Sequence, residues 1–231
     1  MSLTLEHPTA PLVPGLGDGR APRETVGHFQ FGRVIDNRPI ALPDWRVSTD
    51  DLRVAEEVAA ILGGTVEECV SHDSGPFEVA TKSSVVQVLV DGPCGISMDM
   101  NLWDARGLIH HCDGVVFLSP VADEGRPCGC PRTMSDRKEH AKSGQGPQPN
   151  TVLTFRLVGV SDLGVFRFQS SSWRLAATVQ DLRGALAALD GPALCELSLE
   201  RVKFRTRSGR TVSYFKPTLE VIGLDCANEV K

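Results

Sequence analysis

Residues 110–132 concentrate the side chains of this chain that are best suited to binding a metal. The run HHCDGVVFLSPVADEGRPCGCPR holds three of the seven cysteines, Cys112, Cys128 and Cys130, and two of the six histidines. Thiolate and imidazole groups are the usual ligands of structural zinc, which takes four of them in a tetrahedron. Fifteen residues separate Cys112 from Cys128, and a hairpin of that length would bring them together. The sequence therefore predicts a structural zinc site with three identified ligands.

The fourth ligand has to be chosen among three histidines. His140 is the first choice because it follows Cys130 by ten residues, in a segment with the composition of a flexible loop. His111 is adjacent to Cys112, and neighbouring residues on a strand point to opposite faces. His110 has the same parity as Cys112 and ranks third. The predicted ligands are Cys112, Cys128, Cys130 and His140. Free cysteines in a tight turn are the alternative.

Motifs that would make such a metal catalytic are missing from the sequence. A zinc deaminase needs His-x-Glu followed by Pro-Cys-x-x-Cys, whereas this chain has Pro-Cys-x-Cys and no preceding His-x-Glu. The His-Glu-x-x-His motif of zinc peptidases is absent as well. Neither a Gly-x-Ser-x-Gly elbow, a phosphate-binding P-loop nor a dinucleotide-binding fingerprint occurs. The sequence therefore indicates a protein that is not an enzyme and has no small-molecule substrate.

The charge and hydropathy of the chain limit the classes of partner that it can bind. The 231 residues carry a net charge of −5, and proteins that bind duplex DNA by themselves normally carry a basic surplus. Direct DNA contact is therefore expected to be absent or secondary. No run approaches the roughly 18 apolar residues of a membrane span, and no signal peptide is recognisable. We expect a protein of the reducing cytoplasm, where clustered cysteines bind metal more often than they form disulfides.

Hydrophobic periodicity predicts an α+β fold with mixed or antiparallel sheets and two long helices. The first helix follows a cap at Ser48 or Thr49 and ends at Gly63, and the second covers about residues 172–189. Residues 135–150 have the composition of an exposed loop. The predicted segments are an extended arm (1–24), an N-terminal α+β half (25–92), a Cys-rich metal-type insert (93–150) and a C-terminal α+β half (151–231).

The two α+β halves share a plan. DWRVSTDDLRVAEEVAAILGG and VFRFQSSSWRLAATVQDLRGALAAL each run from an aromatic-containing strand through a hydroxyl cap into a helix, and paired strands follow. This pattern favours two related strand–helix–strand–strand halves, although many α+β proteins repeat such units without duplication. Trp103 and Trp173 are expected to anchor the core.

A hairpin near the C-terminus carries a concentration of basic side chains. Ser208 and Gly209 suit its turn. The candidate partner-binding residues are Arg201, Lys203, Arg205, Arg207 and Arg210. They could meet an acidic face of a protein partner or lie near phosphates. The alternative is a solvated hairpin whose charges protect a sheet edge.

Several short motifs in order resemble a known family. GHFQFGR, NRPIALPDWRV, AAILGGTVE, HHCDG, PCGCP, a Pro-x-Thr segment and LGVFRFQSSSWRLAA together resemble recombination directionality factors of Streptomyces phages that use large serine integrases, with the phi-C31-like group nearest. The resemblance covers about residues 25–222. It implies a non-catalytic protein that binds its integrase on attachment-site DNA. Integration (attP with attB) would be inhibited, and prophage excision (attL with attR) would be permitted.

The resemblance also implies a zinc-type cluster, which maps to Cys112, Cys128 and Cys130. Related proteins often have a further cysteine before the Pro-x-Thr segment, where this chain has Pro147-Gln148-Pro149. Either His140 replaces that ligand or the site is degenerate. Two other functions stay open at this point: a metal-dependent hydrolase with an open zinc position, and a small DNA-binding modulator that acts through the basic hairpin.

Overall fold

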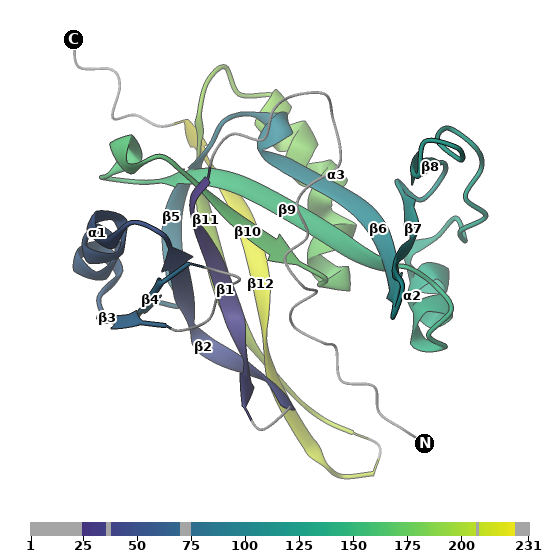
Figure 1. The fold of residues 1–231 in the computed structure, drawn as a ribbon, viewed down its shortest axis with the longest axis horizontal. Coiled ribbons are helices and arrows are strands. Elements are labelled where there is room, and N and C mark those ends of the chain that lie inside the picture. Colours follow the sequence, from purple (N-terminus) through teal and green to yellow (C-terminus); the bar gives the residue numbers. More distant parts are fainter. Residues whose placement is uncertain (1–24, 36–37, 70–74, 207, 225–231) are drawn as a thin grey trace.

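Strands dominate the fold, and all twelve described strands belong to one mixed sheet (Figure 1). The structure, a computed structural model, describes residues 25–35, 38–69, 75–206 and 208–224, so the predicted arm 1–24 lies outside it. The strands are β1 (Thr25–Ile35), β2 (Arg38–Thr49), β3 (Thr65–Glu68), β4 (Phe77–Ala80), β5 (Val85–Val90), β6 (Ile96–Asp104), β7 (Gly107–Cys112), β8 (Phe117–Ser119), β9 (Gln148–Leu157), β10 (Val165–Ser170), β11 (Ala193–Arg205) and β12 (Thr211–Leu224). The helices are α1 (Leu52–Leu62), α2 (Met134–Lys142) and α3 (Trp173–Ala187), with short 3-10 turns at Pro93–Gly95 and Ser161–Leu163. The predicted α+β class is confirmed.

The strand order is β12-β11-β5-β9-β10-β1-β2-β4-β3, with β6, β7 and β8 branching from β9. Every pairing is antiparallel except that of β1 with β10, which is parallel and makes the sheet mixed. Strand β5 comes from the predicted N-terminal half, yet it lies between β9 and β11 of the C-terminal half. Strands of the two halves therefore alternate within one sheet. The segment boundaries and the proposed duplication stay predictions.

The core is organised around Trp45, a residue that the sequence did not single out. Its side chain is fully buried, and its Nε1–H donates to the Ser84 carbonyl at 3.2 Å. The Phe168 ring meets it edge to face with centroids 5.1 Å apart, a favourable arrangement for aromatic pairs. Trp103 and Trp173 are only half-buried, so the expectation that they anchor the core was wrong.

Helices α1 and α3 form where apolar residues recur at helical spacing. The N-cap of α1 is Asp51, whose carboxylate accepts from the Arg53 backbone N–H at 2.8 Å, and not Ser48 or Thr49 as expected. Gly64 ends the turn after α1 with a φ of +107°, and a Cβ there would lie 2.0 Å from the Ala80 carbonyl oxygen. Helix α3 begins at the N-cap Ser172 and buries its apolar face in the main core.

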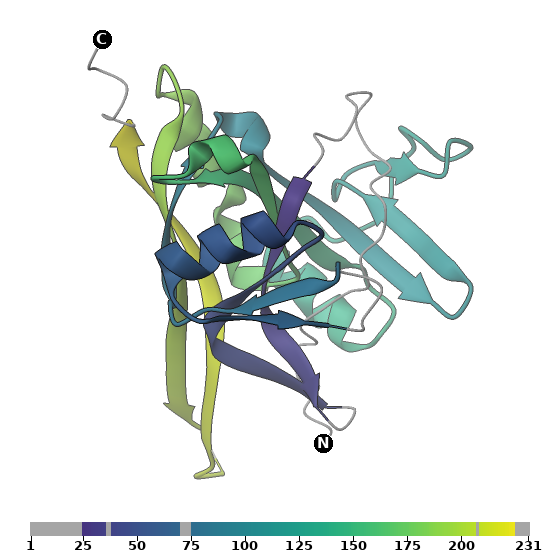
Figure 2. The ribbon, with the colours of Figure 1, turned by 60° about the vertical axis from the view of Figure 1, so that its left-hand side comes forward.

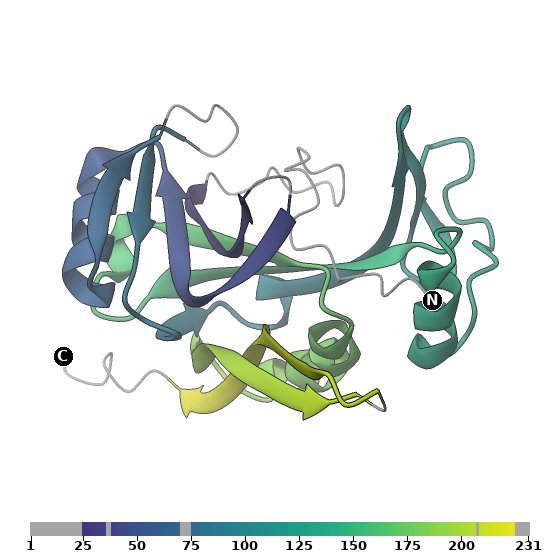
Figure 3. The same ribbon diagram turned by 90° about the horizontal axis from the view of Figure 1, so that it is seen from below.

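The predicted loop region contains a separate lobe of regular structure. Strands β7 and β8, the outer end of β6 and helix α2 lie at one end of the molecule, far from α1 (Figures 1 and 3). Residues 135–150 were expected to form a loop, but α2 covers their whole first half and β9 begins at Gln148. The helix has no apolar stripe, and none of its residues is buried. Its start is fixed by Thr133, whose hydroxyl accepts from the Asp136 backbone N–H at 3.1 Å.

Strands β11 and β12 extend beyond the sheet as a two-stranded hairpin (Figure 2). Strand β5 pairs with β11 only as far as Ser198, whereas β11 and β12 pair with each other on to Arg205 and Thr211. Among the described residues, no third strand pairs with the outer part of the hairpin. Among the described residues, none of the helices is long and apolar enough to cross a membrane.

Candidate metal centre

Strand β7 places two metal-binding side chains on one face. His110 and Cys112 are two residues apart, so the alternation of a strand directs both side chains to the same side. The His110 Nε2 atom lies 3.1 Å from the Cys112 sulfur. The Phe117 ring of β8 packs against the His110 imidazole, with centroids 4.7 Å apart. The strand pairing and this ring contact hold the histidine next to the thiol.

The loop after β8 brings the other two thiols to this face. The Cys128 backbone N–H donates to the Val115 carbonyl at 3.0 Å, which ties the returning chain to the turn after β7. Arg137 of α2 adds two links: its Nε donates to the Pro131 carbonyl at 2.6 Å and its Nη2 to the Gly114 carbonyl at 2.7 Å. Helix α2 therefore holds both chain segments of the cluster.

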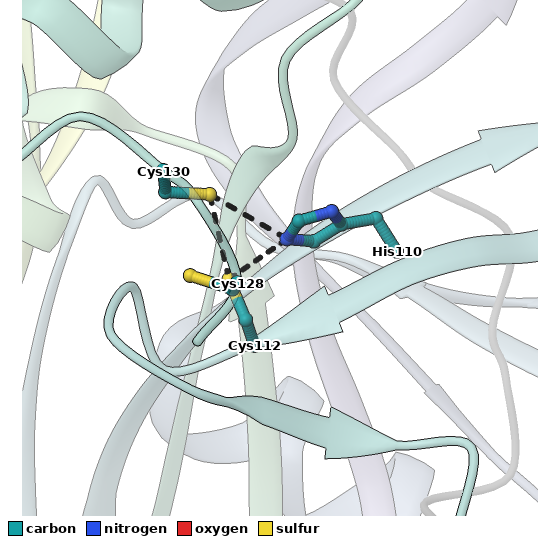
Figure 4. Close-up of side chains that lie close together, drawn as sticks. All are labelled: His110, Cys112, Cys128 and Cys130. Atoms are coloured by element: carbon teal, nitrogen blue, oxygen red, sulfur yellow. Dashed lines mark hydrogen bonds between the residues drawn. The ribbon is translucent and has the colours of Figure 1, made fainter. Parts of the chain in front are cut away.

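The four donor atoms have the spacing of a tetrahedral metal site (Figure 4). The ligand atoms of His110, Cys112, Cys128 and Cys130 all lie within 4.8 Å of one another. The Cys112 and Cys130 sulfurs are 3.7 Å apart, and His110 Nε2 is 3.5 Å from the Cys130 sulfur. Two sulfurs bound to one zinc ion at about 2.3 Å would be roughly 3.8 Å apart, and a sulfur and a nitrogen roughly 3.6 Å. Three thiols and an imidazole at this spacing fit a metal ion such as zinc.

Burial disfavours the charged forms of the thiols and of the imidazole in this cluster. It raises the pKa of the Cys112 thiol strongly and that of Cys130 less, because an isolated thiolate is poorly solvated there. Burial also lowers the pKa of His110, which favours the neutral imidazole that binds metals. A divalent cation would supply the charge that stabilises the thiolates.

The histidine that the structure places beside the three thiols is His110 and not His140. Three of the four predicted ligands come together, but His140 lies in the last turn of α2, is exposed and is not part of the cluster. It is near enough that its charge contributes, after burial and His111, to the lowered pKa of His110. The alternation of side chains along β7, which puts His110 on the same face as Cys112, was the signal that could have identified His110. His140 was preferred because it was expected to lie in a flexible loop.

His111 points to the opposite face of β7 and joins three strands. Its Nδ1 lies 2.9 Å from the Ser119 hydroxyl of β8, and its Nε2 lies 3.0 Å from an Asp99 carboxylate oxygen of β6. Serine hydrolases use the opposite ring orientation, with Nε2 toward the serine. The half-buried Ser119 and Asp99 thus satisfy the buried His111 ring and fasten the strands that carry the metal cluster.

The basic side chains predicted to bind a partner lie on the hairpin. Arg201, Lys203 and Arg205 alternate along β11, so they share one face, and all three are exposed. Arg210 is exposed beside the turn, while Arg207 lies outside the described residues. Apart from Arg207, the four basic residues of the hairpin named above form no ion pair within the described part of the chain. The hairpin therefore presents unneutralised positive charge to solvent.

The sequence matches a family model over residues 24–222, described as Gp3-like, recombination directionality factor-like. The chain belongs to this family. The match confirms the family that the sequence motifs indicated. In this recombination directionality factor-like protein it spans the sheet, nearly all of the hairpin, and the lobe formed by β7, β8, the outer end of β6 and α2, which we call the metal lobe. No solved structure gave a significant match to the chain.

Proposed function

We propose that this protein is a recombination directionality factor that binds a large serine integrase on attachment-site DNA. It switches the integrase from joining attP with attB to recombining attL with attR, and it inhibits integration. The observation that carries this proposal is the family match over residues 24–222. A match to one motif alone would support it far less.

The protein acts on the integrase without catalysing a step itself. A regulator that favours one arrangement of a DNA-bound enzyme needs only a higher affinity for that arrangement. Moving a two-state equilibrium from 1:99 to 99:1 takes about 5.5 kcal/mol of differential binding, which a protein interface can supply. The site of action is the cytoplasm of the bacterial host, where the integrase and the prophage are located.

We infer that the cluster of His110, Cys112, Cys128 and Cys130 binds zinc as a structural ion. Three thiols and one imidazole are a common zinc ligand set, and the bound ion links β7 to the loop after β8. Four protein ligands complete a tetrahedron and leave no open position for a substrate or an activated water. The donor set therefore argues against the alternative of a zinc hydrolase.

The basic hairpin is a candidate contact with the integrase, through Arg201, Lys203, Arg205 and Arg210. Direct binding to DNA is secondary in this proposal because the chain as a whole carries a net charge of −5. A DNA-binding modulator remains the contrasting hypothesis, supported by the unneutralised cations of the hairpin.

Association is tested by electrophoretic retardation of integrase on labelled attL and attR. We expect the protein to retard the integrase–DNA complexes further and to leave bare DNA unshifted at 0.1 M salt. Retardation of bare DNA that disappears as salt increases would favour the DNA-binding hypothesis. If the complexes are unchanged and metal stimulates turnover of a model phosphodiester, the hydrolase hypothesis would replace the proposal.

A further inference from the structure

An open recess of about 320 Å³ lies where α2, the start of α3 and strand β12 meet. We call it the cationic recess, and the side chains that matter for its chemistry are Lys138, Arg174, Lys216, Met134, Trp173 and Tyr214. Neither the metal ligands nor the basic face of the hairpin belong to it. Its walls come from three elements that are far apart in sequence.

The recess is suited to negative charge. Three of its lining side chains, Lys138, Arg174 and Lys216, are basic, and none of the described residues that line it is acidic. Lys216 is largely buried and forms an ion pair with Glu200 across the β11–β12 ladder at 2.5 Å. Arg174 is exposed, so its charge is available to a ligand. The Lys216 charge is therefore balanced by Glu200, and the positive character of the lining comes from the accessible Arg174 and from Lys138 of α2.

Two helices begin at the recess. Met134 is the first residue of α2 and Trp173 the first residue of α3, and both line it. The first N–H groups of a helix have no partner within the helix, and the helix dipole makes this end positive. Asp136 already stands in the first turn of α2, so it is the start of α3, with no acidic residue in its first turn, that together with the basic side chains favours carboxylate groups in the recess.

An apolar strip continues from the recess along the hairpin. Tyr214 lines the recess and is paired with Val202, while Phe204 is paired with Val212, so these four side chains share one face. The Phe204 and Tyr214 rings lie edge to face with centroids 6.4 Å apart. They are 48% and 38% exposed, respectively. Contiguous exposed apolar surface is typical of sites that contact another protein.

We propose that the cationic recess and this apolar strip together bind a segment of the integrase that carries carboxylates beside aliphatic or aromatic side chains. The proposal rests on the proposed function, for which it names the chemistry of the contact. A DNA backbone would match the positive charge but offers nothing for Val202 and Val212 to pack against. A protein segment is therefore the ligand that fits both the cationic recess and the apolar strip.

The metal lobe contributes one wall of this surface. Met134 and Lys138 come from α2, and Arg137 of the same helix holds the chain segments around the metal cluster. Folding of the lobe around its metal therefore determines where Lys138 stands relative to α3. This gives the metal a role in binding the partner as well as in stability.

The test compares two charge reversals on the same helix, made in the full chain. Arg174→Glu lies in the recess, whereas Arg183→Glu introduces the same charge at an exposed position of α3 outside it. Binding to the integrase encoded by the same genome is measured by fluorescence anisotropy, and thermal unfolding checks the fold. We expect Arg174→Glu to raise Kd at least about tenfold and Arg183→Glu to leave it within about twofold. Phe204→Ala should raise it at least about fivefold.

A photo-crosslinking amino acid at the exposed Ser135 identifies the occupant. We expect the crosslink to fall in an integrase segment that contains acidic and apolar residues. If the wild type binds but Arg174→Glu and Arg183→Glu bind alike, the recess proposal is wrong and the proposed function stands. If the wild type does not bind the integrase, the proposed function itself fails. Loss of bare-DNA binding in Arg174→Glu with integrase binding intact would make the recess a nucleic-acid site and overturn the proposal.

Discussion

At the scale of single residues, the metal centre depends on which of two histidines is the ligand. Nε2 of His110 is 3.1 Å from the Cys112 sulfur, whereas His140 stands outside the cluster. We predict that His110→Ala lowers the zinc content and the melting temperature, and that His140→Ala leaves both close to wild type, because only the first removes a donor atom. Elemental analysis and thermal unfolding of the purified variants measure the two quantities. Equal zinc loss in the two variants would show that the ligand assignment is wrong.

Cys195 is buried in the main core and links stability to alkaline pH. Burial raises the pKa of its thiol from an ordinary value of 9.0 to about 11. Above pH 9 the unfolded thiol ionises while the folded thiol stays neutral. Its contribution to stability is therefore complete below pH 9 and is lost as the pH rises to about 11.

The prediction is tested by comparing Cys195→Ala with Cys94→Ala, since Cys94 is exposed. Between pH 9 and 11 the wild type and Cys94→Ala should each lose about 2 kcal/mol more stability than Cys195→Ala does. Urea unfolding at several pH values gives these numbers. Parallel pH profiles for all three proteins would contradict the assignment.

At the scale of elements, α2 is held in place by Arg137 more than by apolar packing. None of its residues is buried, while the Arg137 guanidinium donates to the Gly114 and Pro131 carbonyls. We predict that Arg137→Ala destabilises the protein by about 2 kcal/mol, because hydrogen bonds to charged groups contribute roughly 1.5–3 kcal/mol. Lys142→Ala is the matched control, since its exposed ion pair with Glu139 contributes little. Urea unfolding that cannot separate the two variants would show that packing positions α2.

The elements that could be predicted from the sequence are those with a clear apolar period. The end of α1 just before Gly63 and a C-terminal hairpin turning at Ser208 and Gly209 were predicted, and the structure has α1 ending at Leu62 and the strands β11 and β12 on either side of that turn. Helix α2 has no such period, and its only signal was the Thr133-x-x-Asp136 pattern of a capped N-terminus. Hydrophobic periodicity does not predict a polar helix of this kind, which is fixed by one cap and one arginine.

At the scale of the whole molecule, the order of the strands in the sheet depends on long-range pairing, which could not be predicted from the sequence. The parallel pairing of β1 with β10 and the insertion of β5 between β9 and β11 join segments that are far apart along the chain. No local pattern specifies such neighbours. The family and the three clustered thiols were predictable because they depend on short motifs. The cationic recess was not, because its walls come from three distant segments.

The central claim, that this protein redirects a serine integrase, is tested most directly by recombination in vitro with purified components. Reactions contain the integrase of the same genome and either attP with attB or attL with attR, with and without this protein. The account predicts that added protein suppresses the first reaction and allows the second. Unchanged products from both site pairs, with an integrase that is active on attP and attB, would contradict it.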